Sequence, residues 1–181
     1  MAQIKVNMTY GASGTLPAVS GANLTTLNAT NISSGTLNAA RYSGGKILQV
    51  VETSDVITLI STTSTTYVTN GIELDITPSA TSSKILLLYQ HVYALGTDID
   101  SDHMAMTIFR DATNLAGDKG LVLNQVNDAW MPVSMTYLDS PSSTSSLNYE
   151  IFFKTSSSGP TCYAGYADFR PASFVALEIG A

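Results

Sequence analysis

Charge, cysteine and long apolar runs are scarce in this chain of 181 residues, and each scarcity argues against a class of protein. Asp, Glu, Lys and Arg make up 12% of the sequence, about half the share usual in soluble domains, so Ser, Thr and Asn must carry its solubility. The formal net charge of −6 argues against nucleic acid or an anionic membrane surface as the main partner.

Cysteine and apolar segments set two further limits. Cys162 is the sole cysteine, so no disulfide can form within the chain, and the expected role of this residue is that of a small buried apolar side chain. No apolar run approaches the roughly twenty residues of a membrane-spanning helix, so no membrane insertion is expected. Residues 1–6 lack the apolar core of a secretion signal, and no export leader is expected either.

Catalytic motifs are missing as well. The sequence contains no Gly-x-Ser-x-Gly nucleophile elbow and no phosphate-binding glycine loop. Its two histidines, His91 and His103, have no cysteine cluster to join in a zinc site. His91 is expected in mid-strand, as a core residue or on a symmetry axis, and His103 in a loop. We therefore predict that the protein is not an enzyme and needs no cofactor.

One acidic cluster begins like a calcium loop, with carboxylates at alternate positions: Asp98, Asp100 and Asp102. An EF-hand loop needs Gly at its sixth position and Glu at its twelfth, where this chain has His103 and Phe109. That motif is therefore rejected. The cluster stays a candidate cation site, beside the favoured interpretation as a solvated acidic turn between strands.

Residues 11–45 form a segment rich in Gly, Ser, Thr, Asn and Ala, in which SGTLPA returns later as SGTLNA. An apolar side chain recurs at every fifth position, at Leu27, Ile32, Leu37 and Tyr42. This spacing matches neither the helix period nor the strand period, and such a repeat needs a neighbour to bury its apolar groups. We predict an extended stalk in which these four residues pack, with a flexible linker as the alternative.

From residue 46 onward, short β-type runs alternate with clusters of turn residues, and helical periodicity is missing. The predicted strands are 46–51, 56–61, 66–76, 84–95, 104–110, 121–125, 131–138, 147–154, 162–169 and 174–179, with a polar turn at 52–55. Short strands at this spacing indicate an all-β fold, an antiparallel, jelly-roll-like β-sandwich. The predicted organisation is therefore an anchoring segment at 1–10, the stalk at 11–45 and a head domain at 46–181.

The strand predicted at 84–95 is apolar on both faces. A sandwich strand with one solvated face should be apolar on its core face only, so the second apolar face must be covered by a loop or by another subunit. We favour the subunit, with Leu86, Leu88 and Val92 as candidate interface residues. Receptor-contacting aromatics are expected in loops, where Trp130, Tyr163 and Tyr166 are candidates, although each is more often a core residue.

Several phrases of the chain resemble bacteriophage tail-fibre proteins of marine and cyanobacterial phages. They are the stalk phrase, STTSTTYVTNGIELDITPSATSSKILLLY (61–89), the TIFRDATNL hairpin (107–115), MTYLDSPSSTSSLNYEIFFK (135–154) and SFVALEIGA (173–181). The resemblance implies homotrimers of β-sandwich domains around a threefold axis, with the N-terminal segment docked on tail, baseplate or capsid proteins of the virion. The chain is shorter than long fibres, which leaves its mounting point open.

The sequence therefore predicts a short homotrimeric fibre that attaches to a host-surface glycan or protein through its head. The first alternative is a decoration or spacer protein of the capsid or baseplate that binds no receptor. The second alternative is a small polysaccharide depolymerase.

Overall fold

A computed structural model describes residues 45–55, 59–96, 102–125, 129–165 and 171–180, all within the unit Ser43–Ala181. The predicted anchor, almost all of the predicted stalk and the four stalk-packing residues lie outside these ranges. No helix in the described part of the chain is long and apolar enough to span a membrane.

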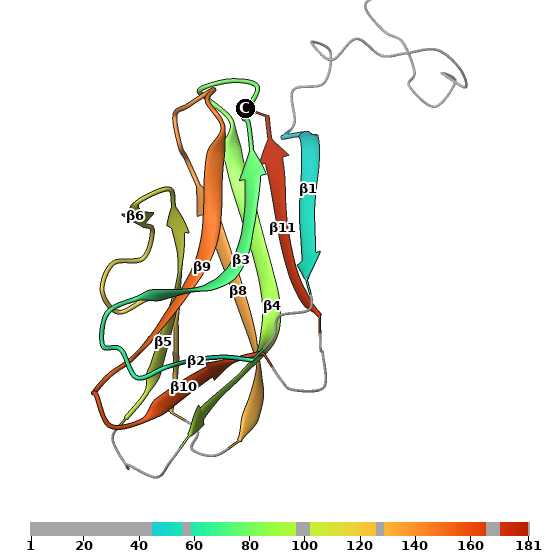
Figure 1. Ribbon diagram of the computed structural model, residues 1–181. Coiled ribbons are helices and arrows are strands. Elements are labelled where there is room, and N and C mark those ends of the chain that lie inside the picture. Colours follow the sequence, from blue (N-terminus) through green and yellow to red (C-terminus); the bar gives the residue numbers. More distant parts are fainter. Residues whose placement is uncertain (1–44, 56–58, 97–101, 126–128, 166–170, 181) are drawn as a thin grey trace, which may run out of the picture. The chain divides into compact units, whose positions relative to one another are not determined.

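Eleven strands are assigned among the described residues (Figure 1). They are β1 (Ile47–Asp55), β2 (Ile60–Thr62), β3 (Val68–Ile76), β4 (Lys84–Gly96), β5 (Met104–Arg110), β6 (Thr113–Asn114), β7 (Val122–Asn124), β8 (Trp130–Asp139), β9 (Leu147–Thr155), β10 (Thr161–Ala164) and β11 (Ala172–Ile179). The predicted all-β class is confirmed.

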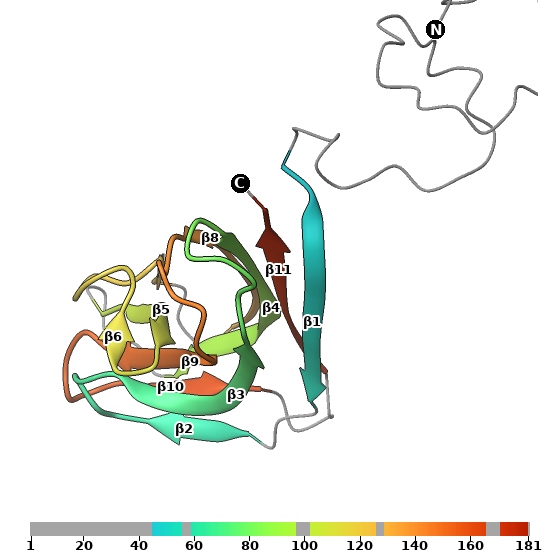
Figure 2. The same cartoon turned by 90° about the horizontal axis from the view of Figure 1, so that it is seen from above.

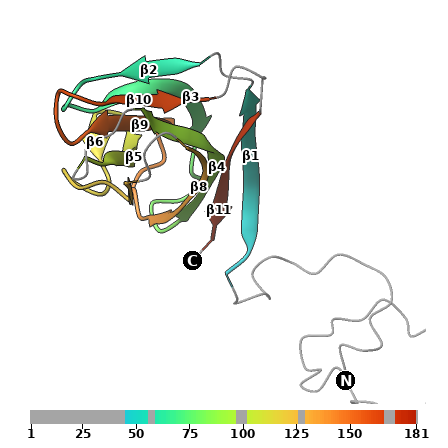
Figure 3. The same cartoon turned by 90° about the horizontal axis from the view of Figure 1, so that it is seen from below.

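The strands form two antiparallel sheets. Sheet A has the order β1-β11-β4-β10-β2, with β8 paired to the other edge of β4. Sheet B has the order β3-β9-β5-β6, with β7 also paired to β5. The long strand β4 is shared along one edge, because β11 pairs with its residues 84–90 and β10 with its residues 93–96. Figures 2 and 3 show β1 beside β11 at the free edge of sheet A.

The pairing of the main strands is nested. The pairs are β1 with β11, β3 with β9, β4 with β8, and β5 with β7. The first main strand thus pairs with the last. Moving inward from both ends of the chain, the second main strand pairs with the second-to-last, and so on to the β5–β7 pair. A long hairpin rolled up in this way, with its pairs alternating between two sheets, is a jelly roll. The jelly-roll topology follows from this chain's own register.

Alternation of apolar residues explains why the two sheets face each other. In β3 and β9 every second side chain is buried, and the same holds for most of β4 and β11. The largest fully buried side chains come from both sheets and include Tyr93, Tyr149, Phe153 and Phe174. Tyr93 of sheet A meets Phe153 of sheet B edge-on, with ring centroids 6.0 Å apart. The core therefore fills the space between the sheets.

Two buried polar groups of the core, Asn70 and Asp139, have partners across the sandwich. Asn70 of sheet B donates its amide protons to the hydroxyls of Tyr89 and Tyr93 of sheet A, which lie 2.7 Å apart. Both carboxylate oxygens of the buried Asp139 in β8 accept hydrogen bonds from the same nitrogen, Nη1, of Arg110 in β5, with N–O distances of 2.9 and 2.7 Å. Such pairing is required because an unpaired polar group in a core costs free energy.

One predicted turn is wrong. Residues 52–55 were expected to separate two strands, but they continue β1, and Glu52 to Asp55 pair in register with Val175 to Ala172 of β11. The reason is that β1 lies at the edge of sheet A with one face toward solvent, where polar side chains are tolerated without ending the strand. The predicted hairpin at 107–115 is confirmed as the β5–β6 pair, with Asp111 in the left-handed region at φ 52°.

Candidate functional site

The outer face of sheet A, which points away from sheet B, carries a contiguous apolar patch. Val50, Leu177, Leu86 and Leu138 lie directly opposite one another in the successive strands β1, β11, β4 and β8. The next row brings Val175 opposite Leu88. We call this set, together with Ile47 and Ile179, the apolar face.

Several side chains of the apolar face remain open to solvent. Val50 is 59% exposed, Leu138 is 49% exposed and Leu88 is 38% exposed, while Leu86, Val175 and Leu177 are half-buried by their neighbours. Scattered apolar residues are ordinary on protein surfaces, whereas a contiguous patch across four strands is typical of interaction surfaces. The predicted interface residues Leu86, Leu88 and Val92 all lie on this side of β4.

A shallow hollow crosses the same side of the sheet. Ser173, Gln90 and Ser134 occupy one row across β11, β4 and β8, next to the row of Val175 and Leu88. The short serine side chains leave space beside the larger residues, a cavity of about 320 Å³. A hollow bordering exposed leucines can accept a protruding side chain of a partner surface, which is the geometry of a packed interface.

Two of the three aromatic candidates meet at the other end of sheet A. Trp130 begins β8 and Tyr163 lies in β10, and both are in register with Ala94 of β4 between them. Their ring centroids are 6.2 Å apart, and Trp130 is 39% exposed. The small side chain of Ala94 lets the two rings approach above it. The third candidate, Tyr166, lies outside the described residues.

The outer side of sheet B has a separate pocket of about 340 Å³. One wall is the 115–121 loop between β6 and β7, which presents Asp118 and Lys119. A second wall is the β2–β3 connection with Thr65, and a third is formed by His103 and Ser156. Lys154 enters from β9, and Ala105 and Leu123 supply apolar surface. We call this cavity the Lys154 pocket.

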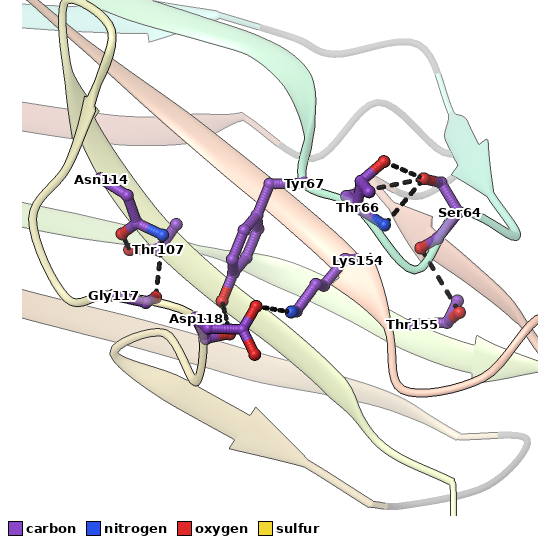
Figure 4. A network of polar contacts seen from close by, with 9 residues as sticks. All are labelled: Ser64, Thr66, Tyr67, Thr107, Asn114, Gly117, Asp118, Lys154 and Thr155. Atoms are coloured by element: carbon purple, nitrogen blue, oxygen red, sulfur yellow. Dashed lines mark hydrogen bonds and ion pairs between the residues drawn. The ribbon is translucent and has the colours of Figure 1, made fainter.

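Lys154 and Asp118 form an ion pair at the rim of the pocket, where the Lys154 side chain is 13% exposed and the Asp118 side chain is 91% exposed (Figure 4). The Lys154 Nζ lies 2.6 Å from a carboxylate oxygen of Asp118 and 4.7 Å from the centre of the Tyr67 ring. The bond and charge of Lys154 lower the pKa of Asp118. Burial, together with the nearby Asp118 charge, raises the pKa of Tyr67 to about 12, so its hydroxyl keeps its proton and donates to the Asp118 carbonyl at 3.0 Å.

The predicted cation cluster is corrected in one part. Asp102 is buried rather than solvated, and its carboxylate accepts a hydrogen bond of 3.0 Å from the Ser156 hydroxyl. Asp98 and Asp100 lie outside the described residues. Within the described ranges, no group of three or more His, Cys, Asp or Glu side chains is placed to hold a metal ion.

The other singled-out residues have structural surroundings. Cys162 is buried, as predicted, and burial, aided by the Asp102 charge, raises the pKa of its thiol to about 12. His91 lies in mid-β4 on the core side between Tyr89 and Tyr93, and the ring centroids of His91 and Tyr93 are 5.7 Å apart. His103 lies before β5, as the loop prediction expected.

An acidic strip on sheet B was missed by the sequence analysis. Glu73 of β3 lies directly opposite Glu150 of β9, and the Asn148 amide bridges Glu73 and Asp75 at 3.1 and 3.0 Å. Thr69 donates its hydroxyl proton to Glu150. These polar partners offset the repulsion between like charges on neighbouring strands.

Comparison with known proteins gives no family. No family model matches the chain, and no curated protein matches it. Among solved structures, the chain is similar to that of the infectious bursal disease virus Gt strain, with 14% identity, a TM-score of 0.41, and coverage of 75% of this chain and 39% of that one. The VP2 subviral particle of the same virus gives 13% identity, a TM-score of 0.36, and coverage of 72% and 39%. The chain thus spans about two fifths of these proteins, and TM-scores this low do not establish a shared fold.

Proposed function

We propose that the chain is a structural protein of a virion, in which the jelly-roll head assembles with copies of itself as a homotrimer. The apolar face of sheet A is the observation that carries this proposal. The resemblance of the sequence to phage fibre proteins and the nested jelly-roll topology agree with it. In this role the head is a decorating or spacing element, held on the virion by the N-terminal segment.

A second copy of the chain is the occupant best suited to the apolar face. The face combines exposed leucine and valine side chains with an uncharged polar row, and its only acidic neighbour in these rows, Glu52, lies at the edge in β1. Burial of exposed apolar side chains contributes roughly 25 cal/mol per Å², so burying this face adds several kcal/mol per subunit. Closed rotational symmetry then presents the same face from every subunit.

The direct test is the solution mass of the full chain, measured by light scattering. The chain mass is 19.1 kDa, so a trimer has a mass of ~57 kDa. Leu88→Asp should give a soluble monomer or a precipitate, because a carboxylate in the buried interface cannot be paired. Ala112→Asp adds the same charge in the exposed β5–β6 turn and should keep the trimer. A monomeric parent chain, or a Leu88→Asp trimer, contradicts the proposal.

Host attachment is the second candidate function, and the Trp130–Tyr163 pair favours it. Partly exposed aromatic rings with a polar edge are common anchors in recognition surfaces. In a trimer the pair would occur once per subunit, so weak single contacts with a surface glycan or protein would add up to firm attachment. A head that carries this pair but binds no host surface would remain a structural spacer.

A further inference from the structure

The Lys154 pocket is held in shape before any ligand arrives. In the 115–121 loop, Leu121 donates its N–H to the Met106 carbonyl at 2.7 Å, and Gly120 closes a turn by donating to the Gly117 carbonyl at 3.2 Å. The side-chain amide of Asn114 also donates to the Gly117 carbonyl, at 2.8 Å. Asp118 and Lys119 therefore lie in a turn that hydrogen bonds hold in place.

Hydrogen bonds also hold the other two walls, the one with Thr65 and the one formed by His103 and Ser156. Thr155 of β9 donates its N–H to the Ser64 carbonyl at 2.9 Å and its hydroxyl proton to the same carbonyl at 3.4 Å (Figure 4), which holds the connection that carries Thr65 in place. His103 and Ser156 are joined by two bonds of 2.9 Å, one from the His103 N–H to the Ser156 hydroxyl and one from the Ser156 N–H to the His103 carbonyl. A site prepared in this way loses little conformational entropy on binding.

We propose that this pocket binds the hydroxyl groups of a small neutral sugar ring. At its rim the Asp118 carboxylate and the Lys154 ammonium group lie 2.6 Å apart, so an acceptor and a donor are presented together. A pair of neighbouring sugar hydroxyls offers the matching donor and acceptor. The Asp118 carboxylate accepts from one hydroxyl, and the Lys154 ammonium donates to the other.

Charge favours a neutral ligand over an anion. Lys119 and Lys154 bring two positive charges to the pocket, and Asp118 in its wall and Asp102 directly behind Ser156 bring two negative ones. With these charges balanced, the pocket offers no net attraction to a carboxylate or phosphate. Thr65 adds a hydroxyl at the rim, and the exposed Leu123 offers an apolar surface for the C–H side of a ring.

The size of the pocket also suits a small ligand. Its volume of about 340 Å³ lies at the lower end of the range of ~300 to 1,000 Å³ for small-molecule sites. A free sugar and the end of a glycan chain present the same hydroxyls, and they differ only in whether further sugars are attached to the ring. The inference goes beyond self-assembly and does not depend on it, because the pocket is complete within one subunit.

The test is a titration of the isotope-labelled full chain with the methyl glycosides of glucose, galactose and mannose, followed through backbone amide NMR signals. At least one glycoside should shift the signals of residues 118, 119 and 154 with saturation. Lys154→Met and Asp118→Asn should each weaken that binding about tenfold or more, since each removes a charged hydrogen-bonding partner. The matched controls Lys84→Met and Glu52→Gln change exposed charges on sheet A and should bind like the parent chain.

The source of the sugar is read from a second arm with a soluble glycan that ends in the preferred ring. A shift of the pocket signals by the glycan as strong as by the glycoside supports a glycan end as the ligand, and a shift by the glycoside alone supports a free sugar. No saturable shift with any glycoside overturns the proposal. Tighter binding of acetate than of any glycoside by the parent chain also overturns it, since the pocket would then be an anion site. The mass measured by light scattering is a separate result, so failure of the assembly proposal is distinguishable.

Discussion

The 115–121 loop lies close to sheet B because Gly120 has no side chain. Gly120 has a φ of 73°, and a Cβ placed on it would lie 2.4 Å from the Met106 carbonyl oxygen and 2.7 Å from the Tyr67 hydroxyl. Gly120→Ala therefore strains the backbone and also pushes the loop off the sheet. We expect a loss of about 2 to 4 kcal/mol in the free energy of unfolding, measured by urea denaturation.

Gly117 is the matched control for this substitution, because its φ of 70° is similar and no atom lies within 4 Å of an added Cβ. Gly117→Ala should cost about 1 to 2 kcal/mol, the cost of the left-handed backbone alone. Equal losses for the two variants would mean that the contact with Met106 and Tyr67 does not contribute.

Residues of a site could be predicted from the sequence where they lie in one strand, and could not where they come from several strands. Leu86, Leu88 and Val92 stood out because they repeat on the second face of an already apolar strand. Val50, Leu138 and Leu177 did not, because each lies in a different strand and reaches the same row through long-range register. The Lys154 pocket was missed for the same reason. Its residues Thr65, His103, Asp118 and Lys154 are far apart in the chain, and no short motif connects them.

At the scale of elements, alternation was the reliable signal. Strands β3 and β9 bury every second side chain, and their pattern is plain in the sequence. The end of β1 was wrongly predicted as a turn because its polar residues 52–55 are held in the strand by β11, from the other end of the chain. Pairing between distant segments follows the fold rather than local composition.

Strand β11 also carries a buried carboxylate that joins it to two other elements. Glu178 accepts bonds from the Gln49 amide of β1 at 2.7 Å, from the backbone N–H and hydroxyl of Ser79 at 2.7 and 2.6 Å, and from the Ser83 hydroxyl at 2.7 Å. Burial alone would raise its pKa, but the bonds from Ser79, Ser83 and Gln49 outweigh burial and lower it to about 2. The ionised carboxylate of Glu178 therefore holds the loop before β4 against the edge of sheet A.

The pH dependence of stability follows from this lowered pKa. Because the folded pKa lies below the ordinary value of 4.5, the contribution of Glu178 is complete above about pH 4.5 and is lost as the pH falls toward 2. The full contribution is about 3 kcal/mol. Urea denaturation at pH 7, 5 and 3 should show a smaller loss of stability on acidification for Glu178→Gln than for the parent chain.

The control for Glu178 is Glu52→Gln, which changes an exposed glutamate of β1. It should keep the pH dependence of the parent chain. If Glu178→Gln loses as much stability between pH 5 and 3 as the parent chain does, the carboxylate of Glu178 is not the group that titrates.

At the scale of the whole molecule, the jelly roll leaves its two outer faces with different characters. The outer side of sheet B carries an acidic strip and a charged pocket, while sheet A exposes leucine and valine across four strands. With few charges in the chain, an uncovered apolar surface of this kind would lower its solubility. In the proposed homotrimer, the apolar faces of the three subunits would cover one another around the threefold axis.

Coupling of folding to assembly makes thermal stability depend on protein concentration. If the folded subunit is stabilised by its neighbours, mass action raises the midpoint of reversible thermal unfolding as the chain concentration rises. We expect the Tm of the parent chain to increase with each tenfold increase in concentration, measured by calorimetry. Leu138→Asp places a charge on the apolar face at a position that is 49% exposed in the single subunit, so the subunit should still fold while the concentration dependence disappears. A Tm of the parent chain that is independent of concentration would mean that sheet A folds without a partner, and its exposed leucines would then need a different explanation.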